Sequence, residues 1–240
     1  MARILDLINR ACTRCKMNSI SKIAGSEDLQ VAEFVEYANQ AAKFIADYYE
    51  WRKLVKEWHL TRDNKNNYQY DDLNHGEKCR FTLPEDYDSL ISRNIYDLNS
   101  DEVLSNQTDD ASLRERAAKT NTSAPSWRIV GEEIVFSSPV ETERDLVLTY
   151  KTKNFVKGAD GKGKTVFTAN DDTFLLDEEA LILGIMWQKS LGYEDTDLQA
   201  RQEQFMGYLE YLKGKDNAKR ITSAFGRDNN RISPTSYQEY

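Results

Sequence analysis

The sequence predicts an α+β protein in which two pairs of helices flank a β-rich middle. Apolar residues recur at helical spacing over residues 2–17 and 29–49, and again over 177–213. Between these stretches, from Val55 onward, apolar and polar residues alternate as they do in half-buried strands. We expect the two helix pairs to pack together as one helical bundle, with the strands as an insertion at one end and an extended C-terminal tail, 214–240.

These patterns divide the 240 residues into four parts. They are an N-terminal helix pair (1–52), a β-rich middle with long polar loops (53–176), a C-terminal helix pair (177–213) and an extended docking tail (214–240). The longest apolar run, Leu181–Trp187, is far shorter than the roughly 18 residues that span a bilayer, so we expect no membrane partner. Three cysteines, an odd number, argue against a disulfide framework and favour a reducing compartment.

The N-terminal pair begins with a helix whose apolar residues fall on one face. That face consists of Ile4, Leu7, Ile8, Ala11, Cys12 and Cys15. Residues 18–25 break the pattern, and 26–28 supply a cap and first-turn acids for the next helix. The broad apolar face of this second helix predicts that it packs against the first as an antiparallel pair.

The β-rich middle is predicted from alternation and from turn residues. The expected strands are 55–62, 79–83, 89–98, 145–155 and 165–169. A further hairpin should turn at Gly131 and end at Pro139, because glycine suits the turn and proline donates no hydrogen bond to a ladder. The polar intervals 63–78 and 99–124 are typical of loops, the second with a short helix at 111–119.

The closing helices are marked by their ends. Asp177 caps a helix that runs to about Leu191 and is dense in apolar residues, and a last helix follows at 195–213. Charge is uneven along the chain: of the net −8, residues 213–240 carry +3 and residues 1–212 carry −11. An acidic body with a basic tail fits a protein that docks by its tail onto an acidic neighbour, and it fits a solvated end equally well.

The segment Gly158–Thr165 matches the nucleotide-binding P-loop pattern of Gly, four residues, then Gly-Lys-Thr. A P-loop requires a helix that begins at this point, because the helix N-terminus provides the phosphate site. Residues 166–172 are β-branched and then turn-like, which favours a hairpin tip instead. A P-loop-like nucleotide-binding enzyme that uses residues 158–165 is therefore the alternative function.

The hairpin tip is basic and contains Lys157, Lys162 and Lys164. Residues 151–165 have a balance of +4 in an otherwise acidic protein, so the tip could contact DNA phosphates or an acidic neighbour, or be a solvated turn. On this interpretation we expect Lys164→Ala to leave folding intact.

No other residues support catalysis, a cofactor or a metal. Cys12 and Cys15 lie in a helix on its apolar face, which favours buried core cysteines over half of a zinc site. His59 and His75 have no nearby nucleophile pattern. Carboxylate pairs are expected among 40 acidic residues, and none follows the calcium-loop pattern. We therefore expect a protein without enzyme activity.

Several segments follow one another in a fixed order along residues 1–213. They are a leading helix pair, a strand with Trp58, the corner Leu83-Pro84-Glu85-Asp86-Tyr87, the hairpin Pro125–Pro139 and a closing helix pair. This order resembles that of the head-to-tail adaptor (connector) proteins of short-tailed bacteriophages. The polar insertion at 99–124 and the basic tip at 157–164 depart from the family's pattern.

The resemblance implies a structural virion protein. Such adaptors form a ring, commonly of twelve copies, between the portal protein and a tail nozzle or tail-tube protein, and genomic DNA passes through the ring's channel. The implied location is the neck of the virion, and the host cytoplasm during assembly. The implied portal-docking tail includes Arg220, Phe225, Arg227, Arg231, Tyr237 and Tyr240. Another neck-ring protein or a DNA-binding protein is the further alternative.

Overall fold

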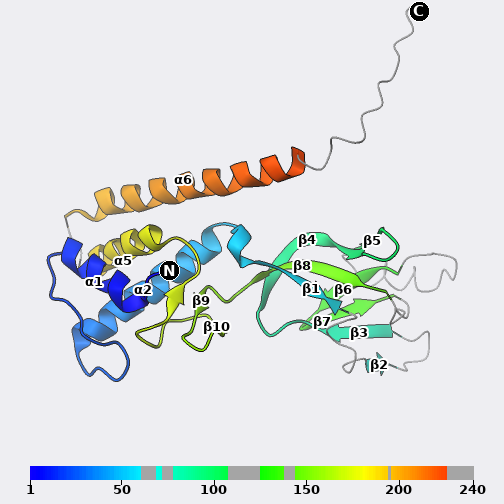
Figure 1. The fold of residues 1–240 in the computed structure, drawn as a ribbon, viewed down its shortest axis with the longest axis horizontal. Helices are drawn as coiled ribbons and strands as arrows, with labels where there is room; N and C mark the ends of the chain where they lie inside the picture. The colour runs from blue at the N-terminus through cyan, green and yellow to red at the C-terminus, as the bar shows by residue number, and fades with distance from the viewer. Residues whose placement is uncertain (61–68, 72–77, 108–124, 138–143, 194–195, 226–240) are drawn as a thin grey trace, which may run out of the picture. The chain divides into compact units, whose positions relative to one another are not determined.

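The computed structural model describes residues 1–60, 69–71, 78–107, 125–137, 144–193 and 196–225 (Figure 1). In this part of the chain the fold is α+β, with four α-helices and three antiparallel sheets. The chain divides into two compact units. Met1–Lys53 and Phe155–Tyr240 form one, here the helical unit, and Leu54–Asn154 form the other, here the β unit.

The helical unit holds all four of these helices and a small sheet with the strand order β10-β9-β11. The helices are α1 (Ile4–Arg14), α2 (Leu29–Tyr48), α5 (Glu178–Gly192) and α6 (Leu198–Phe225), with a 3-10 turn η1 (Arg52–Leu54) after α2. The strands are β9 (Val156–Lys157), β10 (Gly163–Lys164) and β11 (Thr173–Phe174). Asp28 caps α2 by accepting a hydrogen bond from the backbone N of Gln30, and Asp177 caps α5.

The predicted bundle of an N-terminal and a C-terminal helix pair is wrong. α5 is the central helix and packs against α1, α2 and α6, whereas α1 and α2 make few contacts with each other. The physical reason is that α5 is apolar around most of its circumference, so it accepts neighbours on several sides. Its buried residues are Ala180, Leu181, Ile182, Leu183, Gly184, Ile185 and Ser190.

One glycine sets the spacing at the centre of this arrangement. A Cβ atom placed on Gly184 would lie 2.8 Å from the Cβ of Ala41 on α2 and 3.2 Å from the ring of Phe205 on α6. The contact with Ala41 is too close for two carbon atoms and the contact with Phe205 is tight, so glycine permits the close approach of α5 to α2.

The predicted extended tail from residue 214 is also wrong in part, because α6 continues to Phe225. Its second half lacks a broad apolar face but has polar partners near the end of α2. Tyr48 donates a hydrogen bond to Glu210, Tyr49 donates one to Asn217, and Asp216 accepts one from the backbone N of Arg52 at 3.3 Å. These bonds favour the continuation of the helix past Leu212 as far as Asn217.

The β unit contains two four-stranded antiparallel sheets. The strand order is β1-β8-β4-β5 in one sheet and β2-β3-β7-β6 in the other. The strands are β1 (Val55–His59), β2 (Gln69–Asp71), β3 (Lys78–Thr82), β4 (Tyr87–Asp97), β5 (Glu102–Ser105), β6 (Trp127–Val130), β7 (Glu133–Phe136) and β8 (Leu146–Thr152). The predicted hairpin is present as β6 and β7, with Gly131 at a φ of +61° in its turn.

Both sheets contribute to one hydrophobic core. Trp58 and Leu148 come from the first sheet and pair across β1 and β8, while Phe81 and Phe136 come from the second and meet edge to face at 5.7 Å. Trp127 is fully buried, and its indole N donates to the carbonyl of Leu104 at 3.0 Å. The two sheets of the β unit therefore share one core.

The structure corrects the predicted strand at 165–169 and the predicted loops, and it does not describe the predicted helix at 111–119. The expected strand at 165–169 is absent from this described segment, and the return strand is the earlier β10. Within the expected loops, Gln69–Asp71 form β2 and Glu102–Ser105 form β5. The expected helix at 111–119 lies outside the described residues.

Candidate functional site

The basic tip is the turn of the β9–β10 hairpin in the helical unit. Lys157 pairs with Gly163 across the hairpin, and the backbone N of Gly158 donates to the carbonyl of Lys162 at 2.8 Å. Gly161 takes a φ of +82°, which glycine adopts without strain. The side chains of Lys157 and Lys162 are exposed, so the tip presents two lysines to solvent.

Lys164, the third predicted tip residue, has a different role. Its ammonium donates to the carboxylate of Asp172 at 2.8 Å, and that carboxylate is fully buried. Asp172 also accepts hydrogen bonds from the backbone N atoms of Thr168 at 2.7 Å and Ala169 at 2.9 Å. Burial alone would raise the pKa of Asp172, but the hydrogen bonds from Lys164 and the two backbone N atoms lower it overall. Lys164 therefore neutralises a buried charge.

Three hydrogen bonds donated by backbone N–H groups join the loop that carries Asp172 to α1, to α2 and to the segment between them. The backbone N of Phe167 donates to Asn39 on α2 at 2.7 Å, and the backbone N of Ile23 donates to Asn170 at 2.7 Å. The backbone N of Ile4, at the start of α1, donates to the carbonyl of Asp172 at 2.8 Å. The Lys164–Asp172 pair thus stabilises a loop that positions both N-terminal helices.

This geometry differs from that of a P-loop. Lys164 lies in β10, and the described residues that follow it form turns rather than a helix whose N-terminus could hold phosphate. The lysine that would reach the outer phosphates is bound to Asp172 instead. The resemblance of residues 158–165 to a nucleotide site is therefore limited to the sequence.

The other candidate ligands are dispersed. Cys12 is fully buried, and burial raises the pKa of its thiol to about 11, while the Cys15 sulfur accepts a hydrogen bond from Arg201 at 3.3 Å. His59 Nδ1 lies 2.8 Å from Asp145 in the β unit. Among the residues that the structure describes, no group of three His, Cys, Asp or Glu side chains could hold a metal ion. Nor does any described helix have the length and apolarity to cross a membrane.

The predicted docking tail begins within α6. Arg220 and Phe225 belong to the last turns of this helix. The remaining four residues, Arg227, Arg231, Tyr237 and Tyr240, lie outside the described residues.

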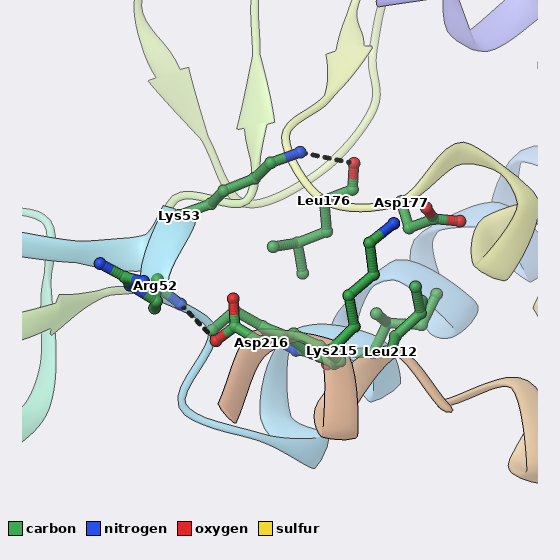
Figure 2. A pocket seen from close by; sticks show the side chains of 9 residues that line it. Arg52, Lys53, Leu176, Asp177, Leu212, Lys215 and Asp216 are labelled. Carbon is green, nitrogen blue, oxygen red and sulfur yellow. Dashed lines mark hydrogen bonds between the residues drawn. The ribbon is translucent and has the colours of Figure 1, made fainter. Parts of the chain in front are cut away.

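A pocket that the sequence did not predict lies beside α6, within the helical unit (Figure 2). It has a volume of about 290 Å³. Its lining residues are Ile45, Trp51, Arg52, Lys53, Leu176, Asp177, Leu212, Lys215 and Asp216. Figure 2 shows Leu176 pointing into this hollow and the Lys215 side chain rising from α6 toward Asp177. We call this feature the α6 pocket.

The charged side chains around the α6 pocket differ in the hydrogen bonds that they make. The carboxylate of Asp177 accepts from the backbone N atoms that it caps and from the hydroxyl of Tyr208, and Asp216 accepts from the backbone N of Arg52. Lys53 makes a long hydrogen bond, 3.4 Å, to the carbonyl of Leu176 and no other hydrogen bond to a described residue. Lys215 is exposed and has no hydrogen bond or ion pair to any described residue. The pocket therefore has an apolar floor and two ammonium groups, of Lys53 and Lys215, with N–H donors that bond to no described residue.

In the β unit, the corner at Asp86 ties three strands together. Its carboxylate accepts from Lys56 on β1 at 2.5 Å and from Tyr150 and Thr152 on β8 at 2.8 Å each, just before β4 begins. Burial would raise the pKa of Asp86, but the hydrogen bonds from Lys56 and the two hydroxyls lower it overall. Burial and the bond to Asp86 together raise the pKa of Tyr150.

Comparison with known proteins does not identify a family for this chain. No protein-family model matches the sequence, and no curated protein matches it.

Proposed function

We propose that this protein is a structural component of a virion: a head-to-tail adaptor whose copies form a ring between portal and tail. One observation supports it most. The Leu-Pro-x-Asp-aromatic corner that carries the resemblance falls on Asp86, the residue that joins β1, β8 and β4. The Leu-Pro-x-Asp-aromatic motif holds these strands together, so a family that shares this β unit would have a structural reason to keep the motif.

The order of the other elements supports the same proposal. α1 and α2 precede β1 with its Trp58, the β6–β7 hairpin follows the corner, and α5 and α6 close the chain. In the proposed ring the acidic body would repel DNA phosphates, so that the genome slides through the channel without binding. The C-terminal tail would dock on the portal, and many copies in a ring would add avidity.

Native mass measurement of the purified chain, alone and mixed with the portal protein of the same virus, tests the proposal. We expect a small species alone and a stoichiometric ring complex with the portal. Absence of any association over a range of ratios would overturn the adaptor assignment.

A truncation locates the docking segment. Because α6 runs to Phe225, deletion of residues 226–240 should abolish portal binding while the far-ultraviolet circular dichroism spectrum stays nearly unchanged. Substitution of the exposed tip lysines, Lys157→Ser with Lys162→Ser, is the matched control and should leave portal binding intact. Retained binding after truncation would exclude residues 226–240 as the docking segment.

The two alternatives make different predictions. A DNA-binding protein would show salt-dependent affinity of the isolated chain for DNA, which the net charge of −8 opposes. A nucleotide-binding enzyme would lose a measurable hydrolysis activity on substitution of Lys164, but the bond to Asp172 accounts for this lysine without a nucleotide.

A further inference from the structure

The α6 pocket has the composition of a binding site for an aromatic side chain with an acidic neighbour. Its floor is formed by Ile45, Trp51, Leu176 and Leu212. The first three side chains are buried, and Leu212 is half-buried. An apolar cavity of about 150 Å³ is enough to hold benzene, so about 290 Å³ leaves room for a phenol ring. The pocket can therefore take a tyrosine side chain.

The rim of the pocket has a net positive charge, because Arg52, Lys53 and Lys215 outnumber Asp177 and Asp216. The carboxylates of Asp177 and Asp216 are engaged with backbone N–H groups, whereas Lys53 and Lys215 keep unused donors. A carboxylate beside the bound ring would gain charge-assisted hydrogen bonds from these ammonium groups. The preferred occupant is thus an aromatic residue next to an aspartate or glutamate.

The sequence of this chain contains such a segment beyond the described residues. Residues 234–240 read Pro-Thr-Ser-Tyr-Gln-Glu-Tyr, with two tyrosines, one glutamate and no basic residue. The preceding residues 226–231 contain two arginines and one aspartate, so the two halves of the tail differ in sign. Only the terminal half complements the lysines of the pocket.

The segment is also long enough to return to the pocket of the same copy. α6 contributes Leu212, Lys215 and Asp216 to the lining, and from Asp216 the helix extends about 14 Å to Phe225. The twelve residues from 226 to Tyr237 span at most roughly 40 Å when extended. A chain of that length can reverse direction after α6 and reach the pocket.

We propose that the α6 pocket binds the segment Tyr237-Gln-Glu-Tyr240 of its own chain, with a tyrosine ring on the apolar floor and Glu239 between Lys53 and Lys215. The pocket and the portal then compete for the same residues, so the tail is held against the helical unit until a portal displaces it. The binding itself does not depend on the adaptor function, whereas the competition rests on that proposed function.

A peptide assay without any portal tests the binding. The probe is a fluorescent, C-terminally amidated peptide of residues 232–240, and its anisotropy is followed during titration with the full-length chain. The chain that carries Tyr237→Ser, Glu239→Gln and Tyr240→Ser has no competing tail and should bind the peptide. The native chain should bind it at least tenfold more weakly, because a tethered segment has an effective concentration of the order of millimolar.

Pocket variants make the test specific. In the chain with the triple tail substitution described above, Lys53→Glu with Lys215→Glu should weaken peptide binding at least tenfold. Lys16→Glu with Lys22→Glu changes the same charge at exposed positions of the same unit and should have no effect. Equal binding by the two double variants, or no binding of the peptide up to about 1 mM, would overturn the proposal.

Protein concentration decides which copy supplies the tail. Competition within one copy is independent of concentration, so the ratio of affinities should be the same over a hundredfold range of native chain. A ratio that grows with concentration would assign the tail to a neighbouring copy and overturn the assignment to the same copy. Failure of this peptide assay leaves portal binding unaffected, and failure of portal binding leaves this assay unaffected, so the two proposals can fail separately.

Discussion

Removal of the Lys164 ammonium should destabilise the helical unit, contrary to the expectation from sequence. The substitution Lys164→Met keeps the methylene chain but leaves the fully buried Asp172 with two backbone donors and no cation. Loss of one partner of a fully buried ion pair costs about 3–5 kcal/mol. The Lys164 side chain is 31% exposed, so solvent reduces this cost, and we expect about 2 kcal/mol at neutral pH.

The stability deficit of Lys164→Met should also depend on pH. Because the pKa of Asp172 is lowered in the folded protein, the pair contributes its full stability above the unfolded pKa of about 3.9 and loses it as pH falls through the folded pKa. In Lys164→Met the carboxylate lacks its cation, so burial raises its pKa. The deficit of the variant should therefore shrink as the pH falls from the raised pKa of the variant to the lowered pKa of the native protein, and it should be smallest where Asp172 is protonated in both proteins.

Urea unfolding followed by circular dichroism at several pH values measures this deficit. Lys162→Met, at an exposed position two residues away, is the matched control and should change the free energy of unfolding by less than about 0.5 kcal/mol. If Lys164→Met were no more destabilising than Lys162→Met at neutral pH, the structural role of Lys164 would be refuted.

Other perturbations test the remaining features. Asp86→Ala should destabilise the β unit by about 2–3 kcal/mol in thermal unfolding, whereas Glu85→Ala, at an exposed neighbour, should be close to neutral. Gly184→Ala should cost about 1–3 kcal/mol because its methyl group has no space, and Gly207→Ala, with open space, should stabilise α6 by about 0.5–1 kcal/mol. With a pKa of about 11 and full burial, the Cys12 thiol should resist iodoacetamide at pH 8 until urea unfolds the protein, as peptide mass spectrometry will show.

Contrary outcomes would identify which inference fails. Equal effects at Asp86 and Glu85 would show that the corner contributes little to stability. A neutral Gly184→Ala would mean that α5 can move away from its neighbours at little cost. Rapid alkylation of Cys12 in the folded protein would show that the α1–α5 contact opens easily.

Local signals in the sequence predicted single elements well. The turn at Gly131 and the cap at Asp177 both lie where their residue types indicated, because turn and cap chemistry depends on a few neighbouring residues. Alternation located β1, β3, β4 and β8 within a few residues of their observed bounds. These features need no knowledge of distant partners.

Features that depend on distant partners could not be predicted in this way. Periodicity identifies the apolar face of α1 but not its neighbour, which is α5 rather than α2. Strands of two residues, such as β9 and β10, are too short to produce alternation. The pairing of Lys164 with Asp172 follows from a turn over eight residues that only the fold reveals, and the α6 pocket combines residues from three separated segments.

The insertion of the β unit into the helical unit has a consequence for synthesis. A ribosome completes residues 54–154 before it reaches α5, so the β unit can fold while the chain is still growing. α1 and α2 make few contacts with each other, and both require α5, which begins at Glu178. The first helices to emerge are thus among the last to be buried, and their apolar faces depend on a helix made more than a hundred residues later.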